Sequence, residues 1–118
     1  MDLALEALRV ISIVAFLGYG VACVAGRSMV KEFERFGLAR FRVLTGVLEV
    51  LGALGLLASY AIPDLLPLAA GGLALLMLLG VLTRIRVRDS LGAMLPAIVL
   101  MLANGALVAH AVAEAAPD

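Results

Sequence analysis

The sequence predicts an all-α protein, an antiparallel bundle of four transmembrane helices that forms one domain over residues 1–118. Three observations lead to this fold class. Hydrophobic residues make up 64% of the chain and its mean hydropathy is +1.16, far above the roughly half-apolar composition of soluble domains. The apolar residues form four runs, each near the ~20 residues that a helix needs to cross a bilayer. These runs are continuously apolar, whereas membrane-spanning β-strands alternate apolar and polar residues.

The first span is expected over residues 8–25. The alternative is a cleaved signal or lipoprotein signal with its apolar core at residues 10–24 and Cys23 as the acylated residue. Asp2 and Glu6 precede this run, where a signal carries positive charge, and basic residues follow it. We therefore favour a retained transmembrane helix.

The connection after the first span, "GRSMVKEFERFGLARFR", separates its apolar and charged side chains onto two helical faces. The apolar face consists of Met29, Val30, Phe33 and Phe36. This pattern predicts a short amphipathic helix that lies on the membrane surface.

The other three spans are expected over residues 43–62, 65–83 and 91–112. Pro63 and Asp64 should end the second span, and Asp64 is a candidate N-cap for the third. Ser90 is a candidate N-cap for the fourth. Connections this short favour sequential helices that are antiparallel neighbours.

The basic residues predict the orientation, because lysine and arginine beside membrane spans are retained on the cytoplasmic side. All of them except Arg9 lie in the first and third connections. We therefore expect a multi-pass protein of the bacterial cytoplasmic (inner) membrane with both termini outside. The formal net charge is zero, so no overall field favours nucleic acid as a partner.

One carboxylate, Glu49, lies inside the apolar stretch "GVLEVLGALGLL". A carboxylate at this depth costs on the order of 2–3 kcal/mol on insertion scales, so it should face the bundle interior. A rise of ~1.5 Å per residue places five residues in one layer about 6–12 Å from the cytoplasmic boundary: Tyr19, Cys23, Glu49, Met77 and Pro96. The same rise places Ser12 and Asn104 in a deeper layer, where they can share a hydrogen bond. The residues predicted to line a ligand site are Glu49, Tyr19, Cys23, Met77, Pro96 and Asn104.

Two roles for Glu49 follow from its depth. It can hydrogen-bond Tyr19, or the Gly92 carbonyl that Pro96 leaves without its usual partner, and so fix the helix register. It can instead be the polar floor of a cavity that receives a head group, a quinone carbonyl or a proton. An arginine that reaches inward would keep it ionised, whereas burial without one would keep it neutral. The candidate arginines are Arg27, Arg42 and Arg84.

The composition argues against chemistry carried by this chain alone. With one cysteine there is no CxxC motif, and with one histidine, His110, there is no zinc or haem site of familiar spacing, so no metal ligands and no catalytic residues are predicted. Small residues repeat every fourth position on two spans, which suits close helix packing within the chain or a homo-oligomer. These residues are Gly18, Ala22 and Gly26, and Gly105, Ala109 and Ala113.

Five stretches together resemble the DoxX-like family of small membrane proteins, over about residues 16–104. They are "FLGYGVACV", "KEFERFGL", "LTGVLEVLGALGLL", "AAGGLALLML" and "LPAIVLMLAN". The resemblance implies a four-helix membrane bundle in which Glu49 matches the acid of the glycine-rich second-helix motif. Many relatives carry a lysine about where Cys23 stands, so a Lys–Glu pair cannot be carried over. The related vitamin K epoxide reductase branch uses paired cysteines, which this chain lacks.

The resemblance implies several roles, since members of the family look like subunits of thiosulfate:quinone oxidoreductases, partners of redox complexes, or assembly factors. Our first hypothesis is a non-catalytic accessory protein that binds a hydrophobic small molecule, a quinone or lipid, or a membrane partner near Glu49. The alternatives are a membrane subunit of a quinone-linked oxidoreductase complex, whose cofactor a partner chain would hold, and a membrane-protein assembly factor.

Overall fold

The computed structural model describes residues 2–115, which are helical apart from short connections and contain no strand in that range. The elements are α1 (Leu3–Ala25), α2 (Arg27–Phe36), the 3-10 helix η1 (Ala39–Phe41), α3 (Arg42–Ala58), α4 (Leu65–Arg86) and α5 (Leu91–Ala115). The described residues contain four helices that are long and apolar enough to cross a membrane, which are α1, α3 with the η1 turn before it, α4 and α5. The all-α prediction and its four long apolar helices are confirmed, as is a short helix after the first of them.

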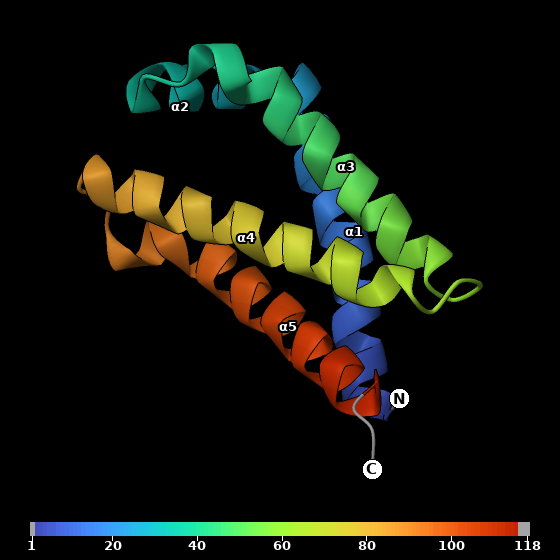
Figure 1. Cartoon of the computed structure of the whole chain (residues 1–118). Helices are drawn as coiled ribbons and strands as arrows, with labels where there is room; N and C mark the ends of the chain where they lie inside the picture. The colour runs from blue at the N-terminus through green and yellow to red at the C-terminus, as the bar shows by residue number, and fades with distance from the viewer. Residues whose placement is uncertain (1, 116–118) are drawn as a thin grey trace.

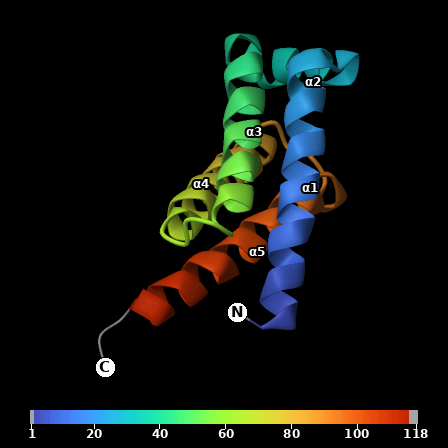
Figure 2. The same cartoon turned by 90° about the vertical axis from the view of Figure 1, so that its right-hand side faces the viewer.

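The long helices form two pairs, because α1 packs mainly on α3 and α4 mainly on α5. Figure 1 shows the α4–α5 pair inclined to the α1–α3 pair. Figure 2 shows α1 and α3 side by side, with α2 lying across one end of them. The second pair therefore diverges from α3 toward the turn between α4 and α5, and this divergence positions the candidate site.

Two glycines set the spacing of α1 and α3. A Cβ atom added to Gly46 would lie 2.7 Å from the Gly20 carbonyl oxygen and 2.8 Å from the Cβ of Cys23. These distances are shorter than van der Waals contact, so the two backbones touch at a place where only glycine fits. Gly18 and Gly105, from the predicted small-residue faces, have open space at the same position and do not form this contact.

The core lies where the two pairs cross. On α3 the buried residues Gly46, Glu49, Ala53 and Leu56 form one stripe at helical spacing, which turns Glu49 inward with its apolar neighbours. The largest fully buried apolar side chains of this core are Phe16, Leu56, Leu73 and Leu107. A buried interhelical bond crosses the same region, since Asn104 Nδ2 donates to Ser12 Oγ at 3.2 Å, as predicted from their equal depth.

The boundary between α3 and α4 differs from the prediction. α3 ends at Ala58, four residues early, because the Ser59 hydroxyl donates to the Leu56 carbonyl oxygen at 2.5 Å and competes with the helical hydrogen bond. The prediction that Asp64 caps α4 is wrong: its backbone is helical (φ −64°, ψ −17°), whereas capping needs an extended residue, and its side chain makes no capping bond.

The other ends follow local capping rules. Ser90 Oγ accepts the Ala93 N–H at 3.2 Å, so the predicted cap of α5 is confirmed. α1 begins at Leu3, five residues earlier than expected, because Asp2 Oδ1 accepts the Leu5 N–H at 2.9 Å. α4 continues to Arg86 and α5 to Ala115, three residues beyond each predicted end.

Candidate functional site

A cavity of about 450 Å³ lies where the α4–α5 pair diverges from α1 and α3. Each of the five α-helices contributes to its wall. Most of the lining is apolar, and the polar groups are few. A largely apolar cavity with a small number of polar groups is typical of small-molecule sites.

Glu49 is the buried acid of this cavity. Its side chain comes from the inward stripe of α3, and the residue is only 5% exposed. Within the described part of the chain, its Oε2 atom has no hydrogen-bond partner. The hydrogen bonds to Tyr19 and to the Gly92 carbonyl that the register hypothesis requires are not present among those residues. The Glu49 carboxyl group can therefore make one more hydrogen bond, as donor or acceptor, to a group from outside the described residues.

Cys23, on α1, is the immediate neighbour of Glu49. It is 2% exposed, and its thiol lies beside the Glu49 carboxyl group. Arg42, one of the three arginines considered as a partner for Glu49, instead donates from Nη1 to the carbonyl oxygens of Cys23 at 2.6 Å and Val24 at 2.7 Å. It satisfies the free carbonyl groups at the end of α1 and leaves Glu49 without a cation.

Five of the six predicted site residues line this one cavity: Glu49, Tyr19, Cys23, Met77 and Pro96. Tyr19 is 48% exposed, so it lies at the rim of the cavity. Asn104 does not line the cavity. Its Nδ2 donates to Ser12 Oγ and to the Leu100 carbonyl oxygen at 2.8 Å, and its Oδ1 has no partner among the described residues. Asn104 therefore joins helices in the layer beyond the cavity.

The aromatic cover of the cavity was missed as part of the site. Phe33 and Phe36 of α2, which were expected on a membrane-surface helix, line the cavity and pack on Cys23. Their rings meet edge to face with centroids 5.8 Å apart, and both residues are less than 9% exposed. Three of the four residues predicted for the apolar face of α2 line the cavity, whereas Val30 is exposed and does not. The sequence did not indicate that this face covers a cavity.

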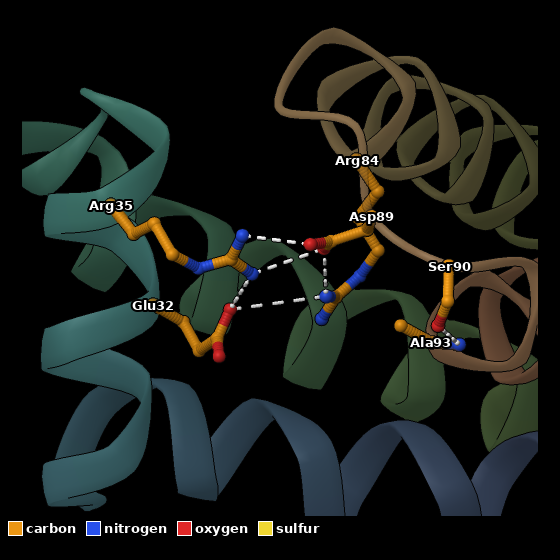
Figure 3. Close-up of polar contacts among 6 residues, drawn as sticks. All are labelled: Glu32, Arg35, Arg84, Asp89, Ser90 and Ala93. Carbon is orange, nitrogen blue, oxygen red and sulfur yellow. Dashed lines mark hydrogen bonds and ion pairs between the residues drawn. The ribbon is translucent and has the colours of Figure 1, made fainter.

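Ion pairs join α2, whose phenylalanines cover the cavity, to the turn between α4 and α5 (Figure 3). Arg35 of α2 donates to both carboxylate oxygens of Asp89 at 2.7 and 3.0 Å, and Arg84 of α4 donates to Asp89 at 2.8 Å. Glu32 accepts from Arg35 at 2.6 Å and lies 3.8 Å from Arg84. The hydrogen bonds from Arg35, with those from Arg84, lower the pKa of Asp89 to about 2.

A second polar cluster, also missed, lies at the far end of α1. Arg9 is 8% exposed and its Nη1 donates to Ser59 Oγ at 3.0 Å. It also pairs with Glu6 and lies over the Tyr60 ring, with its Cζ atom 3.7 Å from the ring centroid. The signal was the i, i+3 spacing of Glu6 and Arg9 on one helix. This cluster joins α1 to the end of α3, away from the cavity.

Comparison of the sequence with known protein families gives a match that covers most of the bundle. The model of the DoxX-like family matches residues 7–106, which include α3, α4, most of α1 and α5, and the residues that line the cavity. The chain belongs to the DoxX-like family. No curated protein and no solved structure gives a significant match. Together with the four apolar helices, membership makes this DoxX-like protein a multi-pass membrane protein.

The site of this DoxX-like protein offers binding chemistry. A buried carboxyl group can donate or accept one hydrogen bond through its free oxygen, and the surrounding wall offers aromatic and aliphatic contacts. No group of three His, Cys, Asp or Glu side chains in the described range is arranged to hold a metal ion. The geometry suits a molecule that is mostly apolar and carries a polar atom at one end.

Proposed function

We propose that this protein binds a hydrophobic small molecule with a polar head, a quinone or a lipid, in the cavity beside Glu49, as an accessory protein of the bacterial inner membrane. One observation carries the proposal. Buried Glu49 lines a cavity of about 450 Å³, and its Oε2 atom has no hydrogen-bond partner among the described residues. An unmet hydrogen bond at a buried acid is costly to retain, and such acids inside membrane proteins mark functional sites.

The size and lining of the cavity support a head group or a quinone ring as the occupant. Small-molecule sites have volumes of roughly 300–1,000 Å³ and combine apolar walls with a few polar groups. Phe33 and Phe36 supply flat apolar surfaces that suit a ring, and Glu49 supplies the polar contact. Met77 adds a flexible apolar side chain that adapts to the shape of the occupant.

The proposed topology places this site in the cytoplasmic half of the membrane. The helices alternate in direction as an antiparallel bundle, with both termini outside and with α2 and the α4–α5 turn on the cytoplasmic side. The concentration of arginine in these two connections supports this orientation. Head groups of the inner leaflet would then lie at the level of Arg84, at the rim of the cavity.

Native mass spectrometry of the protein purified in a mild detergent tests the proposal. We expect one retained quinone or lipid per chain. Glu49→Leu keeps a side chain of similar size and removes every hydrogen-bonding atom, and it should abolish retention. Glu34→Leu is the matched control, because Glu34 is exposed on α2 and does not line the cavity. It should retain the ligand as the unmodified protein does.

Other outcomes of the same experiment overturn the proposal. Equal retention in Glu49→Leu and Glu34→Leu would remove Glu49 from the site. A copurifying flavin- or iron-containing chain without a small molecule would instead favour the oxidoreductase subunit, and a membrane-protein client would favour the assembly factor.

A further inference from the structure

An apolar groove runs along the membrane-facing side of α3 and α4 and adjoins the cavity. Its volume is about 500 Å³, and every residue that lines it is leucine, glycine or alanine. Three leucines belong to both the groove and the cavity: Leu48, Leu76 and Leu79. Leu48 and Leu79 are 44% and 52% exposed, so side chains that form the partition between the two spaces also face the surroundings of the protein.

The groove extends from this partition away from α2, between α3 and α4. On α4 it runs from Leu79 back to Leu65, which at ~1.5 Å per residue is about 20 Å. The two helices touch along it, because a Cβ atom added to Gly52 would overlap the Leu73 side chain and one added to Gly55 would lie 2.9 Å from the Cβ of Ala69. Near its middle, Gly72 lines the groove, and an added Cβ there would meet no atom within 4 Å. The groove thus combines close helix contacts with open space at Gly72.

We propose that the ligand is an amphiphile with a neutral head and one long apolar tail, whose head lies beside Glu49 and whose tail passes between Leu48 and Leu79 into this groove. The inference rests on the proposed function, since it extends the same site. The main support for the inference is that the groove and the cavity adjoin each other at the three shared leucines. A tail in the groove would touch almost only apolar atoms, and the head would make the hydrogen bond that Glu49 Oε2 leaves unmade.

The charges around the cavity favour a neutral head. An anionic head would approach Glu49 without a free cation, because Arg42 is held by the carbonyl groups of α1 and Arg84 by Asp89. A neutral carbonyl or hydroxyl group needs only one hydrogen bond there. Long-chain quinones and monoacylglycerols share this chemistry, and the experiment distinguishes them.

Binding of two matched probe pairs to the full chain in lipid nanodiscs tests the inference. One pair is a quinone with a one-isoprenoid tail and the same ring with a decyl tail. The other is monobutyrin and monoolein, which share a glycerol head. We expect the long-tailed member of one pair to bind about tenfold more tightly than its short-tailed partner. The pair that shows this difference identifies the source of the ligand.

Filling the groove should remove the effect of tail length. Gly72→Leu places a side chain in open space, so the long-tailed probe should bind only as well as the short-tailed probe, whose affinity stays unchanged. Gly105→Leu is the matched control, since Gly105 is equally open but lines neither the groove nor the cavity. Leu75→Ala, which truncates an exposed side chain of the groove, should reduce the preference for the long tail without risk of overpacking.

The possible failures are distinguishable. Absence of binding of all four probes to the unmodified protein would overturn the proposed function. Equal binding of long and short members, or a tail preference that survives both Gly72→Leu and Leu75→Ala, would overturn the inference alone. Preferred binding of dodecyltrimethylammonium over all four probes would overturn the neutral head. Loss of a dimer in Gly72→Leu with tail preference intact would assign the groove to a second copy and overturn the inference.

Discussion

The contact between α1 and α3 can be tested by adding one methyl group. In Gly46→Ala the new Cβ would lie 2.7 Å from the Gly20 carbonyl oxygen and 2.7 Å from Cγ2 of Val24. Ordinary contact begins near 3.4 Å, so the helices must separate by about 0.7 Å. Overpacking of this kind costs about 1–3 kcal/mol, and the higher helix propensity of alanine returns up to about 1 kcal/mol. We expect a net loss of about 1–2 kcal/mol in the free energy of unfolding.

Reversible unfolding in mixed micelles, followed by circular dichroism against the fraction of denaturing detergent, measures this loss. Gly18→Ala is the matched control on α1, because its added Cβ meets no atom within 4 Å. It should be neutral or slightly stabilising. If Gly46→Ala were as stable as Gly18→Ala, the close approach of α1 and α3 would be refuted. Because Cys23 and Glu49 lie next to this contact, Gly46→Ala should also weaken ligand retention.

Three further predictions concern other polar groups. A double-mutant cycle with Ser12→Ala and Asn104→Leu should give a coupling energy of about 0.6–1.7 kcal/mol in the same unfolding assay; additive effects would exclude their hydrogen bond. Glu49→Leu should leave the free energy of unfolding unchanged or raise it by about 1–3 kcal/mol while ligand retention is lost, and a large destabilisation would favour a structural role instead. The hydrogen bonds from Arg35 lower the pKa of Asp89 from 3.8 to about 2. The ionised carboxylate should therefore contribute stability that is complete above about pH 4 and lost as the pH falls through 2. The melting temperatures of the protein and of Asp89→Asn should converge over that range. A constant difference between the two melting temperatures down to pH 2 would contradict the ion pairs of Asp89.

Position at the cavity, and not hydrogen bonding alone, distinguishes Glu49 from the other buried polar residues. Asn104 donates its amide to Ser12, yet among the described residues its Oδ1 has no partner, as is also true of Glu49 Oε2. Glu49 lines the cavity, whereas Asn104 does not. This difference explains why the binding proposal centres on Glu49 and excludes Asn104.

Hydropathy and helical rise were sufficient to predict much of this protein. The free energy of transfer into hydrocarbon depends on local composition, so the four apolar runs could be located without knowledge of any contact. Depth along a helix is also a local quantity, which is why Tyr19, Cys23, Glu49 and Met77 were correctly grouped in one layer. The same arithmetic correctly paired Ser12 with Asn104.

The inclination and rotation of the helices could not be derived in this way, because they depend on packing between residues far apart in the chain. The contact of Gly20 with Gly46, in place of the predicted Gly18 face, follows from which faces of α1 and α3 meet. The ion pairs of Arg35 with Asp89 join positions 54 residues apart and hold α2 over the cavity. Hydropathy thus sets how deep each side chain lies, whereas tertiary packing sets which side chains face one another.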